Sequence, residues 1–400
     1  MIVYEFKLKG KDPQYRLIDE AIRTGQFIRN KALRYWMDNQ GVNKYDLNKQ
    51  SAILSKEFKF ADKLNSSARQ SACERAWSAI SRFYENCKKN VLGKKGFPKF
   101  QKNNRSIEYK KSGWKLSENR KKLTLTDKHK IGTLKLIGSR DLNYYQIEQI
   151  QRVRIVKRAD GYYAQLCIKA DVRNPEKFFE PTGGAIGLDV GLKYFYVDSN
   201  GNTVENPQYY RHAEKQLNRL NRQKSKKFRQ GQKQSNRYLK AKNRYSRKHL
   251  KVIRQRRGYA TEIAYRVVQS NDLIAYEDLK VKNMVKNRKL AKSISDISWS
   301  TFRQWLEYFA FKYGKVTVAV RPHNTSQNCS NCGKKVEKSL STRTHICPHC
   351  KYVEDRDVNA AQNILKKGLS TVGHTGTYAQ GDLPSWLVGV ILLANGESMN

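Results

Sequence analysis

Four cysteines in the last quarter of the sequence are arranged as two pairs. Cys329 and Cys332 form the first pair and Cys347 and Cys350 the second, in the pattern C-x2-C-x14-C-x2-C. Each pair places two thiolates on one tight turn, and two such turns complete a tetrahedral shell for one zinc ion. Gly333 follows the first pair, where such a turn needs a positive φ angle. Because protein ligands fill all four positions, we expect this zinc to be structural.

Two alternatives fit the spacing of these cysteines less well. A dithiol redox motif needs one such pair, whereas the sequence has two. His345 and His349 lie close to the second pair and offer ring nitrogens as ligands. Since four cysteines already fill a tetrahedral shell, neither histidine is required.

Three carboxylates stand beside apolar segments in a chain that has few acids. Asp189 ends the segment AIGLD, Glu277 follows the apolar stretch 273–276, and Asp357 precedes a segment with helical spacing. Singly, each is more typical of a cap or a turn. A two-metal phosphodiester nuclease, however, needs several carboxylates from different elements to hold two divalent ions roughly 3.5–4 Å apart. Mg²⁺ prefers such oxygen ligands, so the three acids together predict a magnesium site.

The charge of the chain indicates a polyanionic partner. Lys and Arg number 79 against 35 acidic residues, a formal net charge of +44, and they are interleaved with 23 Tyr and six Trp. Positive charge attracts phosphates and aromatic faces stack on exposed bases. Membrane binding usually shows a short basic cluster beside an apolar anchor, whereas here the excess is spread over nearly the whole chain. We therefore expect nucleic acid as the partner rather than a membrane or a merely solvated surface.

The remaining features are typical of a cytoplasmic protein. The N-terminal segment MIVYEFKLKG lacks the apolar core of a signal peptide, and the apolar run at 386–394 is too short to cross a bilayer. This run is interpreted as a docking segment or a poorly ordered tail. Cys73, Cys87 and Cys167 are scattered and form no disulfide framework, which fits a reducing interior.

Hydrophobic patterns divide the first part of the chain into strands and helices. Residues 1–10 alternate like a strand, and apolar residues recur at helical spacing over 12–33 and 68–89. Four β-like segments follow, at 122–125, 133–137, 145–155 and 162–169, of which the last two predict a hairpin. A strand separated by helices from further strands indicates a small β-barrel with a helical insertion.

The second part begins with two strands and a basic stretch. Segments 185–190 and 194–197 predict paired strands joined through a bend at Gly191. Between residues 211 and 257 there are nineteen Lys or Arg and one acid, Glu214. Such a run is often a solvated face, but apolar residues at helical spacing predict a helical hairpin, broken near Gln230 and Gly231, that lies against nucleic acid.

Several motifs resemble those of one nuclease family. GLDVGLKYF, IAYEDLKVKNM, and CSNCG…CPHC followed by DRDVNAAQNI resemble the three RuvC motifs and the zinc insertion of TnpB proteins. The order strand-Asp, strand-Glu, helix-Asp is that of RNase H-like RuvC nucleases. TnpB proteins are encoded by bacterial insertion sequences and are related to type V CRISPR nucleases. GFPKF, ENPQYYR and NRKLAKSISDISW extend the resemblance to most of the chain.

The resemblance implies an α+β multidomain fold. Its parts would be a WED-like β-barrel, a REC-like helical insertion, an RNase H-like RuvC α/β domain, an inserted zinc ribbon and a C-terminal tail. In this sequence they correspond, in that order, to residues 1–10 plus 101–180, 11–100, 181–322 plus 353–372, 323–352, and 373–400.

It also implies roles for individual residues. Asp189, Glu277 and Asp357 would be the catalytic triad that binds two Mg²⁺ ions, and the four cysteines would bind one structural zinc. Asp278 and Asp355 neighbour two of these acids and are interpreted as structural. Arg343 would help to seat the strand being cut. Ser67, Gln70 and Ser71 lie where the inserted helix faces DNA in relatives, or they form an ordinary polar helix face.

The function implied is RNA-guided cleavage of DNA. The expected partners are a guide RNA of the omega-RNA kind and double-stranded target DNA recognised beside a short flanking motif, in a monomeric ribonucleoprotein of the bacterial cytoplasm and nucleoid. Two alternatives remain. Nuclease-dead relatives act as RNA-guided regulators but typically lose one or more of the acids, which are intact here. A transposase would catalyse strand transfer, yet the zinc-inserted RuvC order favours hydrolysis.

Overall fold

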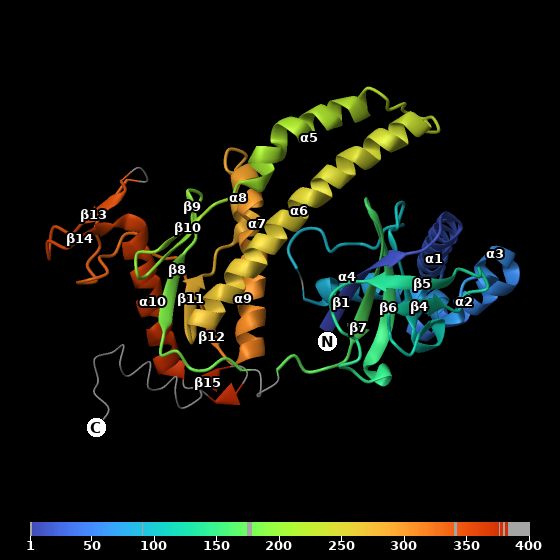
Figure 1. Ribbon diagram of the computed structural model, residues 1–400, viewed down its shortest axis with the longest axis horizontal. Coiled ribbons are helices and arrows are strands. Elements are labelled where there is room, and N and C mark those ends of the chain that lie inside the picture. Colours follow the sequence, from blue (N-terminus) through green and yellow to red (C-terminus); the bar gives the residue numbers. More distant parts are fainter. Residues whose placement is uncertain are drawn as a thin grey trace. The chain divides into compact units, whose positions relative to one another are not determined.

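The computed structural model divides the chain into two compact units, Met1–Val172 and Arg173–Asn400 (Figure 1). It describes residues 2–89, 91–173, 178–339, 342–375, 377–378 and 381–382, with side chains up to residue 372. The apolar run at 386–394 and most of the predicted tail lie outside the described residues. Among the helices in these ranges, none has both the length and the apolar character needed to cross a bilayer.

An antiparallel sheet of seven strands is the centre of the N-terminal unit. Its order is β2-β6-β7-β1-β5-β4-β3, and its strands are β1 (Ile2–Lys9), β2 (Ser106–Lys110), β3 (Trp114–Leu116), β4 (Lys122–Leu125), β5 (Gly132–Ile137), β6 (Ile150–Arg158) and β7 (Gly161–Ile168). Only Lys111–Gly113 separates the edge strands β2 and β3, and so short a linker spans at most roughly 14 Å. The sheet therefore curls until its edges approach. It is barrel-like but open, since these edges share no ladder among the described residues.

Four helices lie between β1 and β2 in the chain. They are α1 (Asp12–Asp38), α2 (Lys44–Glu57), α3 (Lys59–Asp62) and α4 (Ser66–Lys88). α1 and α4 pack on each other and share one hydrophobic core with the sheet. The sequence predicts both, but not α2, because α2 buries only three side chains and so shows no clear apolar stripe.

Two serines of α4 face the core. Ser67 and Ser71 are 4% and 2% exposed, whereas Gln70 is exposed. A Cβ added at Gly113 would lie 2.6 Å from the Ser67 hydroxyl oxygen, so α4 needs small side chains where it crosses the turn after β2. For these two serines the prediction of a polar face toward DNA or solvent is therefore wrong.

The β6–β7 hairpin closes with Arg158 opposite Gly161, as predicted. β6 starts five residues later than the pattern indicates. The intervening residues include a 3-10 turn, Ile147–Gln149, in which Oε1 of Gln149 accepts from the backbone N–H of Gln146 at 2.7 Å.

A five-stranded sheet forms the middle layer of the C-terminal unit. Its order is β10-β9-β8-β11-β12, with β8 (Ala185–Asp189), β9 (Tyr194–Asp198), β10 (Thr203–Glu205), β11 (Leu273–Glu277) and β12 (Val316–Val320). β8, β11 and β12 are parallel, and β9 pairs antiparallel with both β8 and β10. The predicted pairing of segments 185–190 and 194–197 is confirmed, since β8 pairs with β9.

Helices cover both faces of this sheet (Figure 1). The described helices of this unit are α5 (Tyr209–Ser225), α6 (Asn236–Ser270), α7 (Val281–Met284), α8 (Ala291–Ile297), α9 (Trp299–Tyr313) and α10 (Arg356–Thr375). The second half of α6 and α9 cover one face, and α10 covers the other. Alternate residues of β11 point to opposite faces: Ile274 and Tyr276 pack with α6 and α9, and Leu273 and Ala275 pack with α10. The unit is thus a three-layer α/β/α sandwich.

A buried ion pair fixes the starts of the parallel strands. Lys315, just before β12, donates to Asp272, just before β11, and to the carbonyl of Glu180. Asp272 also accepts from the backbone N–H groups of Thr182 and Gly183. Both charged side chains are at most 1% exposed. Removing one partner of such a pair typically costs about 3–5 kcal/mol, so this network holds the segment before β8 in register.

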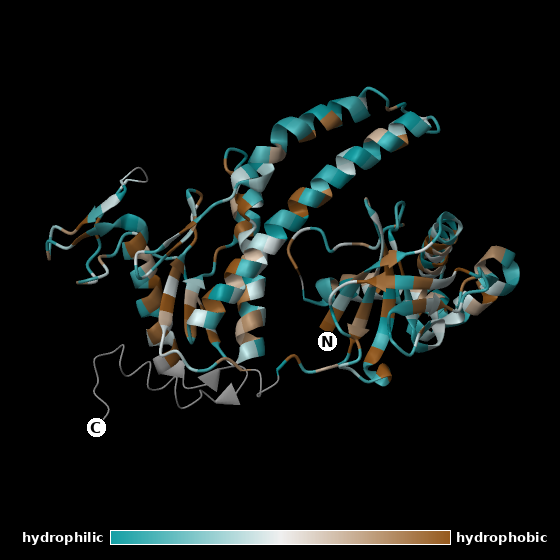
Figure 2. Ribbon diagram, viewed as in Figure 1, coloured by the Kyte–Doolittle hydropathy of each residue, from teal (hydrophilic) through white to brown (hydrophobic). Residues whose placement is uncertain are grey.

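α5 and the first half of α6 form the predicted helical hairpin, with the break at residues 226–235. Ala213, Leu217 and Val252 pack where the two helices meet. The rest of the arm is largely hydrophilic (Figure 2). The hairpin is therefore a long basic arm that extends from the C-terminal unit, and it is called the basic arm below.

α10 lies with its backbone against the sheet. A Cβ added at Gly187 in β8 would lie 2.1 Å from the carbonyl oxygen of Ala361, and one at Gly368 would lie 2.5 Å from the Cβ of Ala275. Both contacts are shorter than any side chain allows, so glycine is required at both. This close approach places the N-terminal turn of α10 at the ends of β8 and β11.

We predict that Gly187→Ala lowers the free energy of unfolding of the C-terminal unit by about 1–3 kcal/mol, because overpacking forces α10 away from β8. The measurement is urea denaturation, with hydrogen exchange of α10 amides to locate the weakening. Gly258→Ala in α6 is the matched control: its Cβ would meet nothing within 4 Å, and it should stabilise by about 0.5–1 kcal/mol. Equal stability of Gly187→Ala and the wild type would contradict the packing argument.

Candidate functional site

The three predicted carboxylates come from two strand ends and one helix start. Asp189 is the last residue of β8 and Glu277 the last of β11. These strands are parallel, with Leu188 opposite Tyr276, so both acids lie at the same edge of the sheet. Asp357 is the second residue of α10, not the residue before it as predicted. The packing of α10 on β8 brings it to that edge.

The electrostatics of this cluster favour a bound cation. Burial raises the pKa of the Asp189 carboxyl well above its usual range, and the charges of Glu277 and Asp357 add to the rise. Burial also raises the pKa of Glu277, against the Thr325 hydroxyl and Lys367, which lower it. Carboxylates in such surroundings favour the neutral form unless positive charge is near. The donor set therefore fits hard divalent ions such as Mg²⁺.

Two neighbouring acids have structural partners, as predicted. Asp355 caps α10, since its Oδ1 accepts from the backbone N–H groups of Asp357 at 2.8 Å and Val358 at 3.3 Å. Asp278 pairs with Arg303 of α9. Both carboxylates are thus engaged in holding the elements that carry the cluster.

Arg343 lies beside the cluster. Its Nη1 is 3.6 Å from Oδ2 of Asp357, and its side chain is 60% exposed. Its carbonyl accepts from the N–H of Arg356 at 2.7 Å, which ties it to the start of α10. An exposed guanidinium here can reach a phosphate next to the carboxylates.

A cavity of about 530 Å³ opens beside Glu277, between β11, α7 and α9. Tyr276, Trp299 and Phe302 supply apolar walls, and Lys280 is also part of the lining. The sequence motifs gave no sign of this cavity, because its walls come from segments that only the fold brings together.

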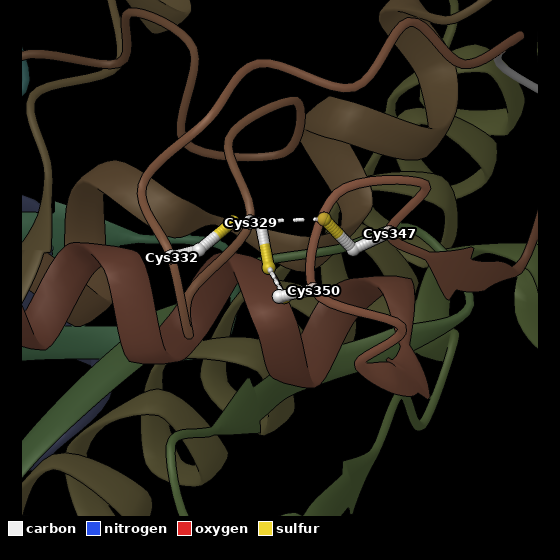
Figure 3. Close-up of side chains that lie close together, drawn as sticks. All are labelled: Cys329, Cys332, Cys347 and Cys350. Carbon is white, nitrogen blue, oxygen red and sulfur yellow. Dashed lines mark hydrogen bonds between the residues drawn. The ribbon is translucent and has the colours of Figure 1, made fainter.

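The four predicted cysteines meet in one cluster (Figure 3). Their sulfur atoms all lie within 4.8 Å of one another, and they are the one such ligand set found among the described residues. The Cys329–Cys350 and Cys332–Cys347 sulfur pairs are each 3.6 Å apart. Four ligands at 2.3 Å around tetrahedral zinc would be about 3.8 Å apart. The cluster could therefore hold a metal ion such as zinc.

Two details support the predicted zinc knuckle. Gly333 has φ of 76°, the left-handed conformation expected after the first pair. His345 is fully buried, and its Nδ1 contacts Lys338, so this nitrogen does not take part in the cysteine cluster. The strands β13 (Thr344–Ile346) and β14 (Val353–Asp355) pair antiparallel around the second cysteine pair and lead into α10.

One buried residue of the site was not predicted. Thr325, between β12 and the first cysteine pair, donates its hydroxyl hydrogen to Oε1 of Glu277. No periodicity or charge marks it in the sequence, and only the folded loop brings it to β11.

Two family models match parts of the chain that carry these features. Residues 299–364 match the family described as "Cas12f1-like, TNB domain", and residues 166–288 match "Probable transposase" (OrfB_IS605). The chain is 34% identical over 134 residues to "TnpB-like protein L79" of Acanthamoeba polyphaga mimivirus, covering 32% of this chain and 26% of that protein. The chain therefore resembles TnpB-like proteins over part of its length. The resemblance inferred from its motifs is confirmed.

The chain is also similar, over longer stretches, to two proteins that are named as nucleases. It is 28% identical over 302 residues to "Putative RNA-guided DNA endonuclease InsQ" of Escherichia coli K12, covering 71% of this chain and 72% of the relative. It is 34% identical over 191 residues to "Putative RNA-guided DNA endonuclease" of Streptomyces pristinaespiralis, covering 47% of this chain and 46% of that protein. The match thus spans about half of the Streptomyces relative.

Among solved structures, the chain matches "Cryo-EM structure of the Cas12f1-sgRNA-target DNA complex" with a TM-score of 0.34 and 17% identity, over 91% of this chain and 99% of that chain.

We predict that replacing Cys329 and Cys332 together by Ser releases the metal and destabilises the segment 323–355, since two of four thiolate ligands are lost. Zinc content by mass spectrometry and hydrogen exchange over this segment are the measurements. Cys87→Ser, outside the cluster, is the control and should keep one zinc per chain. Unchanged zinc in the double variant would exclude the proposed ligand set.

Proposed function

We propose that this chain is an RNA-guided DNA endonuclease of an insertion sequence, which hydrolyses target DNA beside a short flanking motif. The observation that carries the proposal is the meeting of Asp189, Glu277 and Asp357 at one sheet edge, with the pKa of Asp189 raised by burial and by the other two charges. Relatives that are named RNA-guided DNA endonucleases share much of the chain.

In this proposal Asp189, Glu277 and Asp357 hold two Mg²⁺ ions. Bound ions of this kind supply an activated water and stabilise the leaving oxygen of an in-line displacement. Arg343 contacts a phosphate of the strand being cut, and the four cysteines hold one structural zinc.

The proposed partners are a guide RNA and double-stranded DNA in a monomeric ribonucleoprotein of the bacterial cytoplasm and nucleoid. The curled sheet and its helices act as WED-like and REC-like parts that hold the guide, with the domain boundaries predicted from the sequence. The basic arm of α5 and α6 binds nucleic-acid backbone. Its charge supports this role, since residues 211–257 hold nineteen Lys or Arg and one acid.

Strand transfer is the second candidate, because one matching family is described as "Probable transposase". A transposase joins DNA ends, whereas the proposed enzyme leaves a cut. Analysis of the DNA products therefore distinguishes strand transfer from cleavage. A guided regulator would bind the target without either product.

We predict that Asp189→Ala and Glu277→Gln each lower the cleavage rate roughly a thousandfold or more, because metal-assisted chemistry loses several kcal/mol of transition-state stabilisation. RNA binding should stay near that of the wild type. Asp278→Asn is the matched control: it alters the acid next to Glu277, which pairs with Arg303, and should keep cleavage within a few-fold. The measurement is cleavage of a DNA duplex that matches the sequenced copurifying RNA.

Cutting by Asp189→Ala at the wild-type rate would remove this residue from the site. If RNA-free protein cut the matched duplex with equal specificity, guidance by RNA would be excluded.

A further inference from the structure

The loop between β12 and the zinc knuckle reaches the proposed active site through one hydroxyl. Thr325 is 5% exposed, and its Oγ1 donates to Oε1 of Glu277. The hydrogen bond favours the charged carboxylate, since it opposes the rise in the pKa of Glu277 that burial causes. The bond also fixes the orientation of the Glu277 carboxylate, because its Oε1 is bound to the buried side chain of Thr325.

Thr325 is in turn held by α10. The Nδ2 of Asn363 donates to the Thr325 carbonyl at 2.9 Å and to the Asn328 carbonyl at 2.7 Å. Asn363 is 8% exposed. A buried amide bound to two carbonyls of one loop fixes that loop at both ends.

Asn359 makes the same attachment one turn earlier on α10. Its Nδ2 donates to the Asn328 carbonyl at 2.8 Å, and its Oδ1 accepts from the Ser330 N–H at 2.8 Å. Its side chain is fully buried. Because one partner is a carbonyl and the other an N–H, the orientation of the amide is set. Asn359 and Asn363 are four residues apart, so they lie on one face of the helix that carries Asp357.

These contacts form one connected path from the zinc knuckle to Glu277. We propose that Thr325 is a positioning residue for Glu277, and that Asn359 and Asn363 hold Thr325 in place by fastening its loop to α10. The inference rests on the proposed function, in which Glu277 binds a divalent ion. The loop between β12 and the first cysteine pair, here called the knuckle loop, supplies the hydrogen bond that orients Glu277.

A purely structural role would predict a different outcome. If Thr325 only filled space, Thr325→Val would behave like the wild type, since Val has the same shape without the hydroxyl. If its hydroxyl orients Glu277, Val should weaken metal binding and Ser should restore it. Loss of a partner that orients a metal ligand typically costs about 10- to 100-fold in metal affinity or activity.

The experiment measures Mn²⁺ binding directly, by electron paramagnetic resonance, on the full chain with its copurified RNA, alongside cleavage at several Mg²⁺ concentrations. Thr325→Val should raise the Mn²⁺ dissociation constant about 10- to 100-fold, with the zinc content unchanged. Thr325→Ser should bind Mn²⁺ like the wild type. Thr261→Val is the matched control, because this threonine of α6 donates to the Arg257 carbonyl of its own helix and does not contact Glu277.

Wild-type Mn²⁺ affinity in folded Thr325→Val would overturn the inference. Should that variant fail to fold, Asn363→Ala tests the same path, since it keeps the hydroxyl but frees the loop. It should weaken Mn²⁺ binding in the same direction, and unchanged binding would count against the path. Failure of the proposed function would give a different result. If the three carboxylates do not bind the metal, Asp189→Ala would bind Mn²⁺ as tightly as the wild type.

Discussion

The backbone contact between α10 and the central sheet is the constraint on which the C-terminal unit depends. Gly187 and Gly368 remove the side chains that would hold the helix away. The N-terminal turn of α10 therefore lies at the ends of β8 and β11, where Asp357 meets the acids of both strands. The same helix presents Asn359 and Asn363 to the knuckle loop. One packing contact thus sets the position of both the carboxylates and the cysteine cluster.

Charge explains why this arrangement points to metal-dependent chemistry on nucleic acid. The chain carries a net charge of +44, yet it places three acids together and partly out of water. Their mutual repulsion and the burial of Asp189 raise its pKa, an unfavourable state that a divalent ion reverses. The surrounding positive charge favours a polyanionic substrate. The acids and the basic surface are therefore complementary parts of one proposed nuclease.

Much of this fold could be predicted from local patterns. Two short segments joined through a bend at Gly191 identified β8 and β9, helical spacing identified α1 and α4, and the cysteine spacing identified the cluster. α2 was missed because it buries few apolar residues, and the late start of β6 depends on a 3-10 turn that the Gln149 side chain stabilises. Ser67 and Ser71 were misassigned because small polar residues at a close helix crossing resemble an exposed face. Thr325 could not be found at all, since its role depends on the folding of a loop onto a distant strand.

The measurement that tests the account most directly is anomalous diffraction from crystals of the RNA-loaded protein soaked with Mn²⁺. The account predicts two manganese peaks, roughly 3.5–4 Å apart, bound by Asp189, Glu277 and Asp357. Manganese bound elsewhere, with no peak beside these three carboxylates, would contradict it.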